Sequence, residues 1–215
     1  ISTTKLTCLG LICQKIVELL FKVFTDWFEL AGFLFGVACV YMAMRNHIIN
    51  WPLAIISSLF YLIFFWNGRL FSDAGLQLVF VGTSIFGWVN WRKMDSGHAS
   101  DQRISRLTHQ EITQAAVITL MAWRAWYWLL PKLMPHSEAL LLDTLTTCIS
   151  ISAVILQARR KLDCWIWWFI ANSIFVPLYI SRGYHATAGL YSILWILSIF
   201  GFIAWRSEMR NQEAV

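Results

Sequence analysis

Two tryptophans and an asparagine recur along one face of an apolar stretch late in the chain. Trp165, Trp168 and Asn172 are spaced 0, 3 and 7, which places their side chains on one side of an α-helix. A flat aromatic ring beside a side-chain amide suits stacking and hydrogen bonding of a planar, polar ligand. Asn172 is also compatible with a hydrogen bond between packed helices, but its tryptophan neighbours favour ligand contact.

Other polar side chains interrupt apolar stretches elsewhere in the chain, and in membrane helices such residues often mark a substrate path. Asp73 and Gln77 are four residues apart, so they share a helix face. Asp73 is equally placed to cap a helix, and threonine hydroxyls in such helices often bond their own backbone. The predicted substrate-binding residues are Asp73, Gln77, Thr147, Trp165, Trp168, Asn172 and Tyr191.

The sequence contains no motif for catalysis or for ATP use. The five histidines lie outside the apolar stretches, and no HExxH, GxSxG or Walker sequence occurs. The five cysteines lack the spacing of metal ligands. We therefore predict facilitated transport without a cofactor, and we keep an integral membrane enzyme or a scaffold as less favoured alternatives.

The composition is that of a membrane protein, with 58% hydrophobic residues, 13% charged residues and a mean hydropathy of +0.59. Thirteen tryptophans fit aromatic belts at the two membrane surfaces, and Trp51, Trp91 and Trp205 are predicted as anchors of this kind. About twenty apolar residues cross a bilayer. The stretches of suitable length are 27–44, 51–66, 74–91, 112–130, 139–157, 164–181 and 187–205.

The chain contains an internal repeat. Residues 75–92 (GLQLVFVGTSIFGWVNWR) and 189–206 (GLYSILWILSIFGFIAWR) are identical at eight of eighteen positions, and the same shift of 114 residues pairs Trp51 with Trp165. Each copy holds three predicted spans, and 112–130 connects them. An odd number of connecting spans makes the copies parallel. The predicted fold class is an all-α membrane protein with seven transmembrane helices in a 3+1+3 parallel-repeat arrangement.

The N-terminal residues are predicted to form a separate amphipathic helix. Lys15, Glu18 and Lys22 lie on one face between apolar residues, which favours a helix on the membrane surface over an eighth span. The predicted division of the chain is 1–25 (amphipathic helix), 26–92 (first repeat), 93–138 (loop and linker helix), 139–206 (second repeat) and 207–215 (tail).

Basic residues concentrate on one side of the predicted membrane segments. Ten of them lie on the side that holds the polar loop 92–111 and the C-terminus: Arg45, Arg92, Lys93, Arg103, Arg106, Arg159, Arg160, Lys161, Arg206 and Arg210. The opposite side holds Lys5, Lys15, Lys22, Arg69, Lys132 and Arg182. The excess predicts a cytoplasmic C-terminus. Arg124 falls inside a predicted span, where it should either extend to the surface or face protein.

Two of these patterns resemble the PnuC family of nicotinamide riboside transporters. They are Phe71-Ser72-Asp73 leading to Leu76-Gln77, and Trp165-x-x-Trp168-x-x-x-Asn172. The resemblance covers 27–205 and includes the 3+1+3 layout, while the N-terminal helix lies outside it. The tryptophan–asparagine pattern is the more specific of the two.

The resemblance implies a bacterial cytoplasmic-membrane protein of SWEET-like fold that assembles as a homotrimer. It further implies energy-independent uptake of nicotinamide riboside, which a cytoplasmic kinase phosphorylates and thereby retains. Trp165, Trp168 and Asn172 would line the substrate site, with Gln77 beside it. A pyridinium face would stack on tryptophan by cation–π attraction. Related members are thought to carry thiamine or riboflavin, so those vitamins stay as alternatives.

Overall fold

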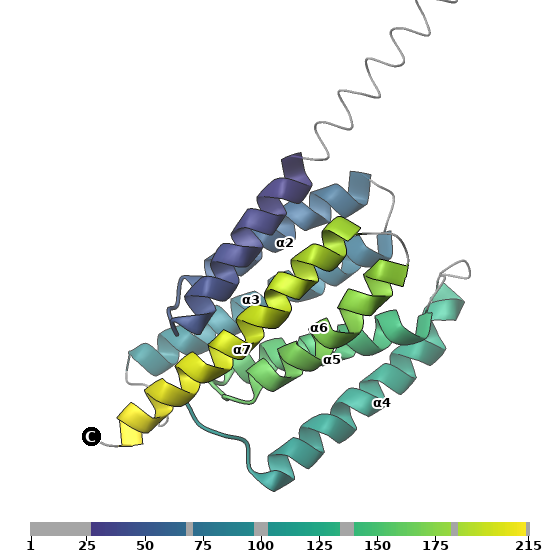
Figure 1. The fold of residues 1–215 in the computed structure, drawn as a ribbon. Helices are drawn as coiled ribbons and strands as arrows, with labels where there is room; N and C mark the ends of the chain where they lie inside the picture. Colours follow the sequence, from purple (N-terminus) through teal and green to yellow (C-terminus); the bar gives the residue numbers. More distant parts are fainter. Residues whose placement is uncertain (1–26, 68–70, 97–102, 134–139, 182–184, 214–215) are drawn as a thin grey trace, which may run out of the picture.

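Helices run side by side through most of the described part of the chain, as the computed structural model shows (Figure 1). The structure describes residues 27–67, 71–96, 103–133, 140–181 and 185–213. The helices within them each overlap nearly all of one predicted span. They are Trp27–Met44, α2 (Asn50–Asn67), α3 (Phe71–Asp95), α4 (His109–Leu133), α5 (Leu140–Ala158), α6 (Cys164–Ser181) and α7 (His185–Glu213). The predicted amphipathic helix over 1–25 lies outside the described residues.

The outer surface of the bundle is apolar along much of its length. Leu78, Ile118 and Ile203 point outward, and each of these side chains is more than half exposed. A water-soluble protein rarely exposes so many large apolar side chains together, whereas hydrocarbon favours them. The described helices that are long and apolar enough to cross a membrane are Trp27–Met44, Asn50–Asn67, Cys164–Ser181 and, within α7, Ala188–Glu213.

The connecting helix α4 lies at one side of the bundle and packs against α5 (Figure 1). The hydroxyls of Thr119 and Ser152 share a hydrogen bond of 2.7 Å between the two helices. Arg124 is exposed on α4, so it does not face the rest of this chain. Extension toward the membrane surface, or contact with protein outside this chain, therefore stays as the prediction for Arg124.

Four tryptophans, two from each repeat, form a buried group that we call the tryptophan cluster (Trp51, Trp91, Trp165 and Trp205). The ring centroids of Trp91 and Trp205 lie 6.1 Å apart at its centre. Trp51 meets Trp91 edge-on at 5.4 Å, and Trp165 meets Trp205 edge-on at 5.7 Å. The prediction of belt anchors at Trp51, Trp91 and Trp205 is wrong, because each is at most 2% exposed and packs where the repeats meet.

Two glycines of the repeat make room for the outer rings of this cluster. A Cβ added at Gly87 would lie 2.4 Å from the ring of Trp51, and one added at Gly201 would lie 2.5 Å from the ring of Trp165. Carbon atoms in contact are about 3.5–4.0 Å apart, so only glycine lets each ring approach the helix backbone this closely. This packing explains why the two copies share these residues.

Two hydrogen bonds between the repeats are counterparts of each other at the shift of 114 residues. The indole N–H of Trp91 donates to the carbonyl oxygen of Gln157 at 3.2 Å, and that of Trp205 donates to the carbonyl oxygen of Ala43 at 2.8 Å. Both acceptors are backbone groups near the end of the first helix of a repeat. Each repeat thus binds the other through a hydrogen bond from a tryptophan side chain to a main-chain oxygen.

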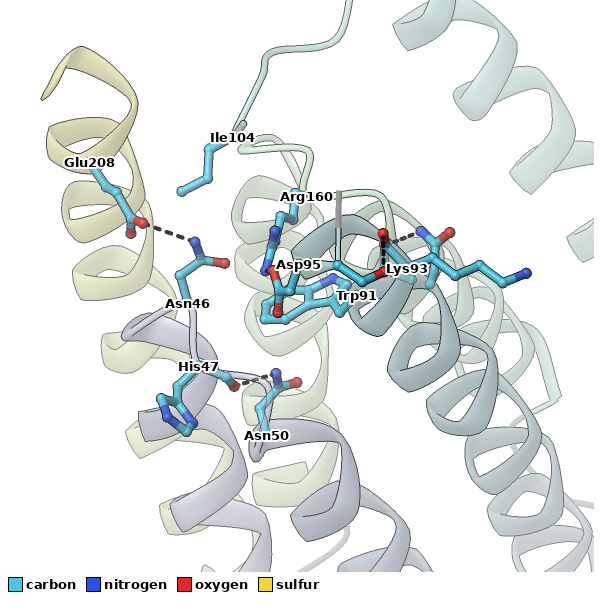
Figure 2. Close-up of polar contacts among 12 residues, drawn as sticks. Asn46, His47, Asn50, Trp91, Lys93, Asp95, Ile104, Arg160 and Glu208 are labelled. Carbon is cyan, nitrogen blue, oxygen red and sulfur yellow. Dashed lines mark hydrogen bonds and ion pairs between the residues drawn. The ribbon is translucent and has the colours of Figure 1, made fainter. Parts of the chain in front are cut away.

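The turns after the first helix of each repeat are also alike (Figure 2). Asn46 and Arg160 have φ angles of 50° and 51°, in the left-handed region that few non-glycine residues adopt. Asn46 Nδ2 donates to Glu208 Oε1 at 2.9 Å, and the Arg160 guanidinium donates to Asp95 Oδ1 at 2.7 Å. Each turn therefore contacts the last helix of the other repeat.

We expect Asp95→Asn to lower the free energy of unfolding by about 2 kcal/mol. The Arg160 side chain is 6% exposed against 45% for Asp95, and its guanidinium lies 4.6 Å from the centre of the Trp91 ring. The substitution removes the carboxylate that balances this buried charge. Thermal unfolding of the purified protein measures the effect. Glu111→Gln breaks an exposed pair with Lys161 (3.6 Å) and should change little, and equal losses in both variants would contradict this account.

The segment that precedes α4 packs onto the end of the bundle. Ile104 is 2% exposed and belongs to the buried core. The N–H of Ser105 donates to the Arg160 carbonyl at 3.2 Å, and its carbonyl accepts from the Leu162 N–H at 2.9 Å. The polar loop predicted over 92–111 is therefore correct only in part, since α3 continues to Asp95 and residues 103–108 are held against the turn before α6.

Thr108 and Glu111 begin α4 with a capping box, which the sequence T-x-x-E could have indicated. The Thr108 N–H donates to Glu111 Oε2 at 2.8 Å, and the Glu111 N–H donates to Thr108 Oγ1 at 3.3 Å. The bond from the Thr108 backbone lowers the pKa of the Glu111 carboxyl, because it favours the ionised form. The stabilisation that the charge adds to this cap is therefore present at neutral pH and is lost as the pH falls through the titration of this carboxyl, while the bond from the Glu111 N–H to Thr108 remains.

Candidate functional site

Trp165, the first residue of the predicted ligand-binding face, lies in the core. Its ring is 2% exposed and packs between Gly201 and Trp205. Its indole N–H is buried and has no hydrogen-bond acceptor in the described part of the chain, and the same is true of Trp51, its counterpart in the first repeat. Because both repeats share this feature, it belongs to their common packing. The N–H is the one polar group that Trp165 offers to a ligand.

Trp168 is half-buried one turn further along α6, and a hydrogen bond holds the edge of its ring. Its indole N–H donates to Gln157 Oε1 at 3.2 Å, and Gln157 Nε2 donates in turn to Asn50 Oδ1 at 3.2 Å. Asn50 Nδ2 completes the series by donating to the His47 carbonyl at 2.8 Å (Figure 2). This hydrogen bond uses the N–H at the edge of the ring, so the face of the indole can still stack on a ligand.

Asn172 is buried between α6 and α7, with 3% of its surface exposed. Its Nδ2 donates to Ser198 Oγ at a long 3.4 Å, while the Ser198 hydroxyl donates to the Leu194 carbonyl at 2.8 Å. The distance is at the limit of a hydrogen bond, so this contact holds the Asn172 amide weakly. An amide held weakly in a buried position is able to turn toward a ligand.

Tyr191 packs in a stack of three aromatic rings between α6 and α7. Its ring centroid lies 4.4 Å from that of Phe175 and 5.2 Å from that of Tyr179. Gln77 is half-buried on α3 and makes no hydrogen bond within the residues that the structure describes. The structure therefore places Tyr191 in a packed aromatic layer and leaves the Gln77 amide available.

Thr147 is half-buried on α5, where two neighbouring threonines behave as structural residues. The hydroxyls of Thr144 and Thr146 donate to the carbonyls of Leu141 and Leu142, at 3.1 and 2.8 Å. Such bonds satisfy the hydroxyl locally and leave little for a ligand. Asp73 lies in the first turn of α3, and its side chain is outside the described part of the structure.

The polar residues of the second repeat differ from those of the first in a consistent way. Trp168 and Asn172 stand where the first repeat has Ala54 and Ser58. The tryptophan cluster and its glycines are duplicated, whereas these ligand candidates occur once. An asymmetric set of polar groups on a symmetric frame suits the binding of one asymmetric molecule.

Gln157 and Asn50, which continue the hydrogen bonds that start at the Trp168 indole, were missed by reasoning from the sequence. Both are buried, at 7% and 0% exposed. The signal that could have found them is the repeat itself, because they stand opposite Ala43 and Cys164 at the shift of 114 residues. A polar residue whose counterpart is apolar is a candidate for something other than the shared packing.

An apolar hollow of about 410 Å³ lies elsewhere, lined by Trp27, Phe28, Ala31 and Phe60. Its lining offers no polar atoms, so it cannot orient a polar ligand by hydrogen bonds. In the described residues, no group of three His, Cys, Asp or Glu side chains is placed to hold a metal ion. The α6 face therefore stays as the best candidate for a polar ligand.

Residues 26–207 match the model of a family described as nicotinamide mononucleotide transporter. The chain belongs to this family. The match runs from the first described helix nearly to the end of α7, so it includes both repeats and the α6 face. The family resemblance found in the sequence is confirmed.

Similar proteins include the nicotinamide riboside transporter PnuC of Escherichia coli, 24% identical over 87% of this chain and 88% of that protein. The riboflavin/roseoflavin transporter RibM of Streptomyces davaonensis is also 24% identical, with the same coverage of both chains. A crystal structure of the vitamin B3 transporter PnuC aligns with a TM-score of 0.71 at 20% identity, over 94% of this chain and 90% of that one. The all-helical membrane fold with seven described helices is thus shared with a member of the family.

Proposed function

We propose that this protein carries nicotinamide riboside across the bacterial cytoplasmic membrane by facilitated diffusion, into the cell. A cytoplasmic kinase that phosphorylates the riboside would retain it there. The observation that carries the proposal is the pair of Trp168 and Asn172 on α6, a half-buried ring one turn from a buried amide, which the first repeat lacks. Membership of a family with nicotinamide riboside transporters among its relatives supports the substrate class.

Each part of the substrate has a matching group on the chain. The cationic pyridinium ring would stack on Trp168, where cation–π attraction adds to the apolar contact. Its carboxamide and ribose hydroxyls need donors and acceptors, which Asn172 and Gln77 supply. Tyr191, Thr147 and Asp73 are proposed to complete the lining.

The chemistry of the lining favours a nucleoside over a nucleotide. None of the proposed lining residues is a lysine or an arginine, so they offer no cation for a phosphate. A doubly charged phosphate in an apolar environment without a cationic partner costs several kcal/mol. We therefore propose the riboside, rather than the mononucleotide of the family description, as the substrate.

The proposed architecture is the 3+1+3 SWEET-like arrangement, with 26–92 and 139–206 as parallel three-helix repeats around the site. The reciprocal bonds of Trp91 and Trp205 and the like turns at Asn46 and Arg160 support this assignment. We propose an amphipathic helix over 1–25, a loop and linker helix over 93–138, a cytoplasmic C-terminal tail over 207–215, and a homotrimer.

Riboflavin is the second candidate substrate, because the relative RibM is 24% identical over 193 residues, against 24% over 212 residues for the E. coli riboside transporter. Riboflavin also presents a flat heteroaromatic ring and a hydroxylated chain. Its ring system is uncharged and larger, so it would gain stacking area on Trp168 but lose the cation–π term.

Counterflow in proteoliposomes tests the proposed function. Vesicles loaded with unlabelled nicotinamide riboside should accumulate labelled riboside transiently, without ATP or an ion gradient, and nicotinamide mononucleotide inside should not drive this accumulation. A scaffold would show no counterflow, and an ion-coupled transporter would show it only when its coupling ion is present. Counterflow driven by riboflavin but not by the riboside would instead establish the second candidate.

A further inference from the structure

We propose that Gln157 is a positioning residue that fixes the orientation of the Trp168 ring for the substrate. This inference rests on the proposed function and assigns a role to a residue outside the predicted ligand-binding face. Gln157 lies near the end of α5, is 7% exposed, and contacts Trp168 of α6 and Asn50 of α2 through its side chain.

The donors and acceptors along this series allow only one orientation of the Gln157 amide. Asn50 Nδ2 donates to the His47 carbonyl, so Asn50 Oδ1 faces Gln157 as an acceptor. Gln157 must therefore turn its NH₂ group toward Asn50 and its oxygen toward Trp168. A flipped amide would oppose the indole N–H with a second donor and would leave both unsatisfied in a buried position.

The oriented oxygen restricts the motion of the Trp168 ring. An indole has two side-chain torsions, and Trp168 is only half-buried, so packing alone does not fully restrict them. A hydrogen bond to the N–H fixes the edge of the ring and thereby the direction of its face. A ring that is already oriented loses less conformational entropy when a ligand stacks on it.

Comparison of Gln157 with Ala43, its counterpart in the first repeat, distinguishes the positioning role from ordinary packing. The Gln157 carbonyl accepts the Trp91 N–H, and in the first repeat the Ala43 carbonyl does the same for Trp205. Alanine is therefore sufficient at this position for joining the repeats. The side chain of Gln157 is additional, and it costs desolvation that an apolar residue would avoid.

A double-mutant cycle in the purified full-length protein tests the proposal, with nicotinamide riboside titrated by calorimetry. Gln157→Met should raise the Kd about fivefold, because it keeps the size of the side chain and removes the acceptor. Trp168→Phe, which removes the N–H but keeps an aromatic face, should also weaken binding. The double variant should bind no more weakly than the weaker single variant, because both changes break the same bond.

Asn90→Leu is the matched control, because it breaks a 2.7 Å hydrogen bond between Asn90 and the Ala158 carbonyl without touching Trp168. It should lower the unfolding temperature and leave the Kd unchanged. Unchanged affinity in Gln157→Met, or an effect that multiplies with that of Trp168→Phe, would overturn the role of Gln157. If Gln157→Met does not fold, unchanged affinity in Trp168→Phe overturns it. Failure of the unaltered protein to bind the riboside would overturn the proposed function itself.

Discussion

Gly201→Ala should prevent most of the protein from reaching a stable folded state, and Gly87→Ala should have the same effect. A methyl group at Gly201 would lie 2.5 Å from three ring atoms of Trp165, and one at Gly87 would lie 2.4 Å from the ring of Trp51. Neither ring can retreat, since each is 2% exposed and meets another tryptophan edge-on. We expect a loss of more than about 3 kcal/mol, at the upper end for overpacking.

The yield of monodisperse protein after extraction, followed by thermal unfolding, measures this loss. Gly75→Ala and Gly189→Ala are matched controls, because they lie in the same two helices and a Cβ at either position meets nothing within 4 Å. Alanine favours helix over glycine by about 0.5–1 kcal/mol, so the controls should be neutral or slightly more stable. Normal stability in Gly201→Ala would show that the tryptophan cluster is not packed as described.

Asn172→Ala should raise the Kd for nicotinamide riboside at least tenfold, and Trp168→Ala should do the same. A buried site built to hydrogen-bond a carboxamide or hydroxyl loses affinity steeply when its own polar partner is removed. Loss of the Trp168 ring removes both the apolar contact and the cation–π attraction, each worth about 1 kcal/mol or more when desolvated. Calorimetric titration of each purified variant measures both effects.

Ser198→Ala distinguishes ligand contact from helix packing at Asn172. It removes the one side chain among the described residues to which Asn172 donates, and it leaves the amide in place. If Asn172 serves the ligand, Ser198→Ala should keep the affinity within about twofold, because the amide is still present. If both variants lose stability and neither loses affinity, Asn172 is a packing residue and the site assignment is wrong.

The helices and their order could be predicted from the sequence, because length and hydropathy set membrane spans almost independently of packing. The role of the tryptophans could not. A tryptophan near the end of a span has the same local sequence whether it faces lipid headgroups or a neighbouring helix, and Trp91 and Trp205 face each other. The repeat held the missing information, since Gly87 and Gly201 recur with the rings that they accommodate.

The candidate site was predictable on α6 and much less so beyond it. Spacing along one helix identifies a shared face, and it found Trp168 and Asn172 together. Partners from other helices depend on packing, so Gln157 and Asn50 emerged only from the structure. For Gln77 on α3, the sequence supplied a candidate amide, and the structure places it half-buried.

The most direct test of the central claim is calorimetric titration of the unaltered protein with nicotinamide riboside, nicotinamide mononucleotide, riboflavin and thiamine. We expect the riboside to bind with a Kd at least about a hundredfold lower than that of the mononucleotide, because the lining offers no cation for a phosphate. Riboflavin and thiamine should bind more weakly than the riboside. Tightest binding of riboflavin, thiamine or the mononucleotide, or no binding of the riboside, would contradict this assignment.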